Sequence, residues 1–262
     1  MTKTLKIGVA GVGAIGSAVC KALLDNEIDG CTLTAISDLK PQPDMPVPNV
    51  NFETLCAECD VIVEALSPDA VENLANIALD QGKILIMISS AALLRFPKLI
   101  VKAENSEGRL IVPSGASSGI DGVNALKSMG IKSATIRSTK KPIAYDGAPF
   151  IIDNHVDLAG ISEKTLLFKG SALEAAKAFP ANVNVAATLS LAGLGPDHTF
   201  VEVWADPAAQ GNSHEIDVQG EYSKIISRVD NLPDPKNPKT SMLAAHSIIA
   251  ALRQMTAKIA VI

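Results

Sequence analysis

A glycine-rich turn near the start of the sequence has the residue types and spacing that bind a dinucleotide. It follows the apolar run 5–10 and opens the stretch 14–24, where apolar residues recur at helical spacing. The first glycine of such a turn permits the tight bend, the second lets the backbone approach a pyrophosphate, and the third lets the helix pack on the strand. N–H groups at the start of the helix then bind the phosphates. The predicted dinucleotide contacts in this turn are Gly11, Gly13, Ala14, Ile15 and Gly16.

Asp38 indicates which dinucleotide is preferred. It is the last residue of the next expected strand, 31–38, and lies 22 positions after Gly16. A carboxylate at this place accepts hydrogen bonds from both ribose hydroxyls and repels a 2′-phosphate, so it favours NAD. Lys40 lies two residues further on and can offset part of that repulsion. NADP therefore stays open as an alternative.

His214 is the candidate for proton transfer. In the stretch 214–220, strand alternation places His214 on the same face as Ile216 and Val218. A histidine on an apolar strand face is often a core residue with its hydrogen bonds satisfied. Beside a dinucleotide, the same placement describes a general acid or base that is shielded from water and has a pKa near neutrality. The other histidines, for which we expect surface or core positions, are His155, His198 and His246.

The elements that position these residues alternate between strand and helix. Apolar runs at 5–10, 31–38, 60–66 and 83–88 are expected strands, and 14–24 and 69–80 are expected helices. This alternation predicts βαβ units and a parallel sheet. We therefore expect a Rossmann-type, doubly wound dinucleotide-binding domain over residues 1–112.

The pattern changes after Pro113, where a stretch rich in Gly and Ser begins. Beyond it, 132–139 and 199–206 are expected strands, and a helix is expected from Gly170 to Ala178. The sequence thus predicts a second, α+β domain over residues 113–237, built on a mostly antiparallel sheet that carries the catalytic residues.

A last helix follows the Pro-rich stretch 231–239, with Thr240 or Ser241 as its N-cap. It has no sheet of its own, so residues 238–262 are expected to pack on the first domain and complete it. Apolar residues on one face of this helix are Met242, Ala245, Ile249, Leu252 and Ile259.

Composition narrows the class of ligand. Of 262 residues, 47% are hydrophobic and 19% charged, which is typical of a globular interior and excludes disorder for the whole chain. The net charge of −5 provides no basic surface for nucleic acid or an anionic membrane. We expect a small-molecule ligand. Polar residues interrupt the apolar C-terminal stretch, and no secretory signal is recognised at the start, so a cytoplasmic location without a membrane span is expected.

The cysteines do not form a metal or disulfide pattern. All of them fall in the first 59 residues, far from the later histidines. Cys56 and Cys59 form a CxxC pair, but no second pair exists to complete a zinc site. We expect small buried side chains and no metal.

Several spaced segments together resemble the L-aspartate dehydrogenase family. They are residues 11–16, 113–119, 179–193, 205–216 and 237–245. The resemblance implies a Rossmann domain completed by the C-terminal helix and a second domain that carries the active site. It also implies oxidative deamination of L-aspartate, linked to NAD or NADP, to iminoaspartate. That product hydrolyses to oxaloacetate and ammonia or feeds pyridine nucleotide synthesis.

The resemblance also implies roles for individual residues. The histidine of the family's active site matches His214, and an asparagine that contacts NAD on the nicotinamide side matches Asn184, with Asn182 the alternative. A backbone N–H that contacts the cofactor falls at Ala116 or Ser118, although a more apolar pair is expected where this loop has two serines. We further expect a homo-oligomer, a dimer.

A dicarboxylic amino acid needs cationic or N–H partners. Lys140, Lys141 and Lys239 are the available candidates, and ordinary surface exposure is the alternative for each. Two other function classes stay open. One is a related Rossmann oxidoreductase of the dihydrodipicolinate reductase or homoserine dehydrogenase type, and the other is a NAD-sensing protein without turnover. The placement of His214 argues against the second.

Overall fold

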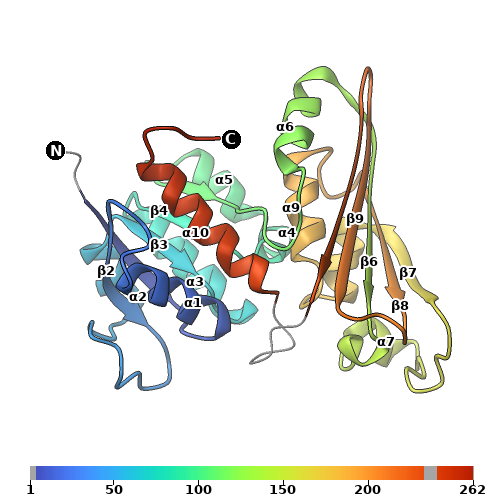
Figure 1. The fold of residues 1–262 in the computed structure, drawn as a ribbon, viewed down its shortest axis with the longest axis horizontal. Coiled ribbons are helices and arrows are strands. Elements are labelled where there is room, and N and C mark those ends of the chain that lie inside the picture. Colours follow the sequence, from blue (N-terminus) through green and yellow to red (C-terminus); the bar gives the residue numbers. More distant parts are fainter. Residues whose placement is uncertain (1–3, 233–240, 262) are drawn as a thin grey trace. The chain divides into compact units, whose positions relative to one another are not determined.

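The computed structural model describes residues 4–232 and 241–261. It divides the chain into two compact units, one formed by Met1–Pro113 with Ala244–Ile262 and the other by Ser114–Leu243 (Figure 1). Each unit is built on its own five-stranded sheet.

The first unit alternates strands and helices around a parallel sheet. The strands lie in the order β2-β1-β3-β4-β5, and each neighbouring pair is parallel. The elements are β1 (Leu5–Ala10), α1 (Ala14–Leu24), β2 (Cys31–Ser37), α2 (Phe52–Glu58), β3 (Val61–Glu64), α3 (Pro68–Asp80), β4 (Ile84–Met87), α4 (Ala91–Arg95), α5 (Lys98–Glu104), β5 (Arg109–Ile111) and α10 (Met242–Thr256).

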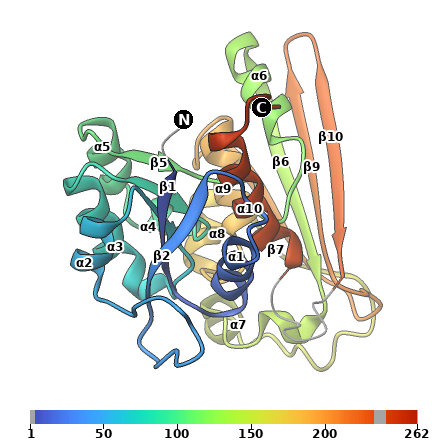
Figure 2. The ribbon, with the colours of Figure 1, turned by 60° about the vertical axis from the view of Figure 1, so that its left-hand side comes forward.

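Helices cover both faces of this sheet, so the central strands β3 and β4 are buried without alternation. On one face, α1 and α10 pack on the sheet through a core that includes Ile7, Val9 and Ile249. On the other face lie α2 and α3 (Figure 2). On this face Gly8 has no side chain and so leaves space for Leu55. A Cβ added to Gly8 would lie 2.9 Å from Leu55 Cδ1. The predicted fold class is confirmed for this part of the chain.

The last helix differs in part from its prediction. Ala245, Ile249 and Leu252 are buried as expected, together with Ile248, and this i, i+3, i+4, i+7 set forms the buried face. Met242 is 45% exposed because it begins the helix, and Ile259 is 87% exposed because the helix ends at Thr256. Neither residue therefore belongs to the buried face. The Ser241 hydroxyl accepts a hydrogen bond from the N–H of Leu243, whereas Thr240 lies outside the described residues.

The second unit contains a mixed, mainly antiparallel sheet. Its order is β10-β9-β6-β8-β7, and only β6 and β8 are parallel neighbours within the described chain. Helices α6, α8 and α9 lie against one face (Figure 2). The elements are α6 (Ile120–Met129), β6 (Ile131–Lys140), the 3₁₀ helix η1 (Pro142–Tyr145), α7 (Pro149–Asp153), β7 (Thr165–Ser171), α8 (Ala172–Ala178), α9 (Asn184–Ala192), β8 (Thr199–Ala205), β9 (Asn212–Gly220) and β10 (Lys224–Asn231).

One helix of this unit begins later than expected. Gly170 and Ser171 belong to β7, and α8 begins at Ala172. A capping box sets this start, because the Ser171 hydroxyl accepts from the N–H of Glu174 while the Glu174 carboxylate accepts from the N–H of Ser171.

Two general features bear on function. Within residues 4–232 and 241–261, no helix is both long and apolar enough to cross a membrane. The four cysteines are buried free thiols, and burial raises the pKa of Cys20 to about 12 and that of Cys56 to about 11. These thiols are therefore protonated and unreactive at neutral pH.

Candidate functional site

The glycine-rich turn is shaped by packing at two of its glycines and open at the third. Gly11 has φ +86°, and an added Cβ would lie 2.3 Å from the carbonyl oxygen of Ala65. A Cβ on Gly16 would lie 1.8 Å from the carbonyl oxygen of Gly11. Around Gly13, by contrast, no atom of the described residues lies within 4 Å of an added Cβ. The turn therefore leaves room for a ligand beside Gly13.

The start of α1 is suited to an anion. Gly13 is the N-cap, and within the described chain no side chain caps the helix. The first turn contains no acidic residue. Because α1 begins at Ala14, the N–H groups of Ala14, Ile15 and Gly16 have no carbonyl partner within the helix. The helix dipole adds partial positive charge at the same end. These features fit a pyrophosphate group.

Asp38 lies against this turn. The strand β2 ends one residue earlier than predicted, at Ser37. One carboxylate oxygen of Asp38 accepts from the N–H of Val12 at 2.7 Å, and the other accepts from the N–H of Lys40 at 2.8 Å. Partial burial opposes ionisation, but these hydrogen bonds outweigh it and lower the pKa of Asp38. The carboxylate is thus ionised and fixed beside the glycines.

The second unit places His214 in a buried polar pair. His214 on β9 lies opposite Ser138 on β6 in the antiparallel register. The distance from His214 Nδ1 to Ser138 Oγ is 2.9 Å, and both residues are buried. Ile216 and Val218 lie on the same buried face, as the alternation predicted. Sequence reasoning missed Ser138, although its position two residues before Lys140 on one strand places both on one face.

Lys140 is buried on the same face of β6. Its side chain donates to the amide oxygen of Asn182 at 2.8 Å, and the residue is only 9% exposed. Among the residues that the structure describes, no carboxylate lies within ion-pair distance of the Lys140 ammonium. A buried ammonium needs a negative partner to offset its desolvation. Lys140 therefore marks a place where an anionic ligand can bind.

Both buried bases have lowered pKa values, and Lys140 contributes to the shift of His214. Burial lowers the pKa of Lys140 to about 8. Burial, with the positive charge of Lys140 as a second cause, lowers the pKa of His214 to about 3. The expectation of a pKa near neutrality is therefore wrong for the free protein, because burial is the larger cause and Lys140, on another strand, adds a positive charge. In the free protein His214 is a neutral imidazole.

The start of α9 adjoins Lys140. Asn182, which binds Lys140, precedes this helix, and Asn184 is its first residue. Val183 is the N-cap, no side chain of the described residues caps the helix, and its first turn contains no acidic residue. The helix thus adds N–H donors and positive partial charge near Lys140.

The loop 114–119 lies along the edge strand β10. The side chain of Asn231 donates to the carbonyl oxygen of Ala116 at 3.3 Å, and the hydroxyl of Ser118 is hydrogen-bonded to that of Ser227. A Cβ added to Gly119 would lie 3.3 Å from Ser227 and 3.6 Å from Ile216. The loop is therefore held on the sheet face that carries His214.

Other predicted residues lie apart from this cluster. Lys141 is exposed and lines a separate cavity of about 570 Å³. His155, His198 and His246 are exposed. Lys239 lies outside the described residues.

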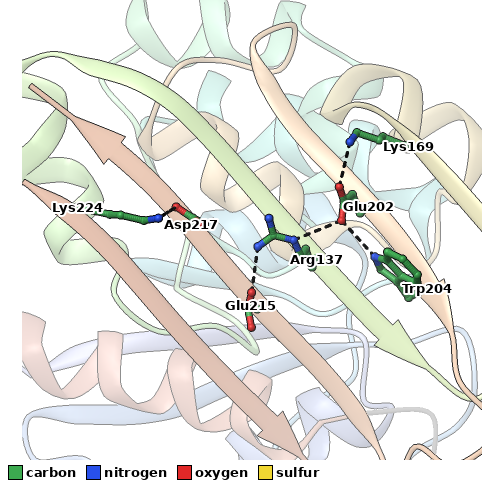
Figure 3. Close-up of polar contacts among 7 residues, drawn as sticks. All are labelled: Arg137, Lys169, Glu202, Trp204, Glu215, Asp217 and Lys224. Carbon is green, nitrogen blue, oxygen red and sulfur yellow. Dashed lines mark hydrogen bonds and ion pairs between the residues drawn. The ribbon is translucent and has the colours of Figure 1, made fainter. Parts of the chain in front are cut away.

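The opposite face of the second sheet carries a network of paired charges (Figure 3). Arg137 bridges Glu202 at 3.3 Å and Glu215 at 3.0 Å, and Glu202 also binds Lys169. These cations already have carboxylate partners within the sheet. They are thus distinguished from Lys140, whose buried charge has none among the described residues.

The fold and these two sets of residues define a pyridine nucleotide-dependent oxidoreductase with a Rossmann-type unit and a second α/β unit. Residues 11–113 match the family model described as homoserine dehydrogenase, NAD binding domain, and residues 121–255 match the model described as aspartate dehydrogenase, C-terminal. The chain belongs to the aspartate dehydrogenase family, which confirms the resemblance seen in the sequence.

Individual relatives support this membership. The chain is 41% identical to L-aspartate dehydrogenase 3 of Bordetella bronchiseptica, over 98% of this chain and 97% of that protein. It is also 41% identical to L-aspartate dehydrogenase of Methanosarcina mazei, over 96% of this chain and 97% of that protein. The crystal structure of aspartate dehydrogenase from Thermotoga maritima matches with a TM-score of 0.75 and 26% identity, covering 98% of this chain and 99% of that one.

Proposed function

We propose that the chain catalyses the reversible oxidative deamination of L-aspartate with NAD as the preferred acceptor and NADP as the alternative. The observation that carries this proposal is the buried Lys140 ammonium, which has only the neutral Asn182 as its described partner and lies on the same sheet face as His214. It supports an anionic substrate next to a proton-transfer group. The relatives named above act on L-aspartate by name, which supports the choice of substrate.

The first unit, completed by the C-terminal helix, would hold the cofactor. The N–H groups of Ala14, Ile15 and Gly16 would bind the pyrophosphate and Asp38 the adenosine ribose. When bound, the nicotinamide would accept the hydride from the substrate. Asn184, or Asn182 in its place, and the backbone at Ala116 or Ser118 stay candidates for contacts nearer the nicotinamide.

Replacing Asp38 by Ser is expected to shift cofactor preference toward NADP. The variant loses a charge-assisted hydrogen bond to the ribose, a loss of about 1.5–3 kcal/mol, and no longer repels a 2′-phosphate. The ratio of kcat/KM for NADP to that for NAD should therefore rise at least about tenfold. Asp44→Ser, at an exposed position of the same loop, is the matched control and should leave the ratio unchanged. A ratio unchanged within about twofold in Asp38→Ser would show that Asp38 does not bind the ribose.

In the second unit, the substrate carboxylates would bind Lys140 and the N–H groups at the start of α9. The Lys140 ammonium is positively charged, and the start of α9 carries partial positive charge. The hydrogen bond from Lys140 to Asn182 places the two close together. Lys141 is exposed and is a weaker candidate, so the structure favours Lys140 of the two.

His214 would transfer the protons. In the tautomer with hydrogen on Nδ1, that nitrogen donates to Ser138, and Nε2 is free to accept a proton. Burial is the main reason that the imidazolium is disfavoured, and the charge of Lys140 is the second; a substrate carboxylate beside Lys140 would cancel that charge. Substrate binding should therefore raise the pKa of His214 and make it a stronger base when it is needed.

The proposed reaction proceeds in two stages. First, the amino group loses a proton to His214 and the Cα loses a hydride, so that the Cα–N single bond becomes the C=N bond of iminoaspartate. Second, His214 returns this proton to the imine nitrogen and, neutral again, takes a proton from water as the water oxygen attacks the imine carbon. It passes that proton to the nitrogen, which leaves as ammonia while the hydroxyl proton is released, which yields oxaloacetate. One water is consumed, and the amine is oxidised by two electrons.

Ser138→Ala is expected to lower kcat about tenfold without changing NADH affinity, because the imidazole then loses the partner that fixes its tautomer and orientation. Turnover and the Kd for NADH measured on one preparation test this prediction. Ser133→Ala, at an exposed position of the same strand, is the matched control. An unchanged kcat in Ser138→Ala would mean that the hydrogen bond to His214 has no part in turnover.

A substrate panel tests the proposed function. Reduction of NAD and NADP is followed by absorbance with L-aspartate and with homoserine, and the reverse reaction is followed with oxaloacetate plus ammonia, aspartate semialdehyde or dihydrodipicolinate. We expect turnover with L-aspartate and with oxaloacetate plus ammonia. Turnover with another pair alone would assign a different oxidoreductase activity, and binding of NAD without any turnover would favour a sensing protein.

A further inference from the structure

Glu64 is a buried carboxylate in the first unit that the proposed reaction does not use. It is the last residue of β3, at the carboxyl edge of the parallel sheet, and it is 0% exposed. Burial raises its pKa, and hydrogen bonds from Ser89 and Leu66 act against that effect. Burying a carboxylate costs free energy, which its hydrogen bonds must offset.

The carboxylate of Glu64 joins two loops. One oxygen accepts from the N–H of Leu66 at 2.7 Å, in the loop after β3, and from the hydroxyl of Ser89 at 2.9 Å, in the loop after β4. The other oxygen accepts from the N–H of Ser89 at 3.0 Å. A single side chain therefore holds the loops that follow two neighbouring strands.

The loop after β3 is in direct contact with the glycine-rich turn. The N–H of Ala65 donates to the carbonyl oxygen of Ala10 at 2.8 Å. A Cβ added to Gly11 would lie 2.3 Å from the carbonyl oxygen of Ala65 and 3.2 Å from the nitrogen of Leu66. The peptide that joins Ala65 to Leu66 thus limits the space beside Gly11.

The sheet order identifies this edge as the ligand side. The chain passes from β1 to β2, which pairs with one edge of β1, and then to β3, which pairs with the other edge of β1. Ligands of open parallel sheets bind outside the carboxyl ends of the strands at such a reversal. The loops joined by Glu64 follow the strands at and next to this point.

We propose that Glu64 is a positioning residue for the cofactor: it fixes the loops 65–67 and 88–90 so that they form one wall of the dinucleotide site. This inference rests on the proposed function, since it assumes that the glycine-rich turn binds the dinucleotide. Glu64 acts through the loops and does not itself bind the dinucleotide. An ionised carboxylate suits this task because it only accepts hydrogen bonds, and each of its described partners is a donor.

Glu64→Gln tests the proposal, because the amide places an NH₂ group where one of the N–H or O–H donors now binds. The Kd for NADH should rise about tenfold at a temperature well below unfolding. The KM for NAD should rise in parallel, while kcat at saturating NAD stays within about threefold, because His214 and Lys140 lie in the other unit. Hydrogen exchange without cofactor should increase in peptides covering 65–67 and 88–90 and stay unchanged in a peptide covering 212–220.

Ser89→Ala provides a milder second variant if Glu64→Gln does not fold. It removes only the hydroxyl donor and keeps the backbone bond, so the Kd should rise about two- to threefold. Glu72→Gln, at an exposed position on α3, is the matched control and should bind NADH normally.

The outcomes separate the inference from the proposed function. Weaker NADH binding with faster exchange in the two loops supports the inference. Normal binding by a folded Glu64→Gln variant, or by Ser89→Ala when only that variant folds, overturns the inference alone. Wild-type protein that binds no NADH contradicts the proposed function and overturns the inference with it.

Discussion

Replacing His214 by Asn is expected to lower kcat with L-aspartate about 10²- to 10⁴-fold, the usual contribution of a general acid or base. The Kd for NADH should change little, because the glycine-rich turn and Asp38 lie in the other unit. The fold should survive, since asparagine retains a polar group that can bond the Ser138 hydroxyl. Turnover, NADH binding and melting temperature measured on one preparation give the answer.

A purely structural His214 would give the opposite result. Turnover per folded molecule would then stay nearly intact, whatever the change in melting temperature. His198→Asn, at an exposed position, is the matched control and should behave as wild type. Near-normal turnover in well-folded His214→Asn would remove His214 from the mechanism.

Replacing Lys140 by Met should weaken binding of dicarboxylates by about 10- to 150-fold, which corresponds to the loss of one charge-assisted hydrogen bond of about 1.5–3 kcal/mol. Methionine fits because it keeps an unbranched, apolar chain in a buried position. The measurement is the Ki of succinate, a dicarboxylate with no amino group. Lys141→Met is the matched control, since Lys141 is exposed, and should leave the Ki unchanged.

The pH dependence of the Ki of succinate is a second test of whether Lys140 binds the carboxylates. Because burial lowers the pKa of Lys140 to about 8, its ammonium is present below that pH and is lost as pH rises through it. The Ki of succinate for wild type should therefore increase above pH 8, whereas that for Lys140→Met should be flat. Succinate keeps both its charges over this range, so the change belongs to the protein. A flat wild-type profile, or a Ki that Lys140→Met leaves unaltered, would show that Lys140 does not bind the carboxylates.

The sequence predicts most of the first unit because its strands are buried on both faces. The mostly apolar runs Leu5–Ala10 and Val61–Glu64 stand out from their surroundings, and the helix Ala14–Leu24 is preceded by the glycine-rich turn. The strand β5 is only three residues long and is partly exposed, so it leaves no comparable pattern. Local sequence also does not show that Gly170 extends a strand, because pairing with Val201 on β8 decides this.

Within the site, the alternation of apolar and polar residues along one strand can be seen in the sequence, but the pairing between strands cannot. The alternation places His214 on the buried face, because Ile216 and Val218 share that face. The partner Ser138 is 76 residues away along the chain, and only the register between β6 and β9 brings it within hydrogen-bonding distance. The pKa of His214 is lowered first by burial and second by the charge of Lys140, which lies on the paired strand β6. Neither effect is indicated by a local pattern.

The most direct test of the account follows the hydrogen at the Cα of L-aspartate. The wild-type protein is incubated with NAD and L-aspartate that carries deuterium at Cα, and the reduced nicotinamide is analysed by mass spectrometry together with the ammonia released. The account predicts one deuterium in each reduced nicotinamide and one ammonia for each NAD consumed. Reduced nicotinamide without deuterium, or no reduction of NAD or NADP by L-aspartate, would contradict it.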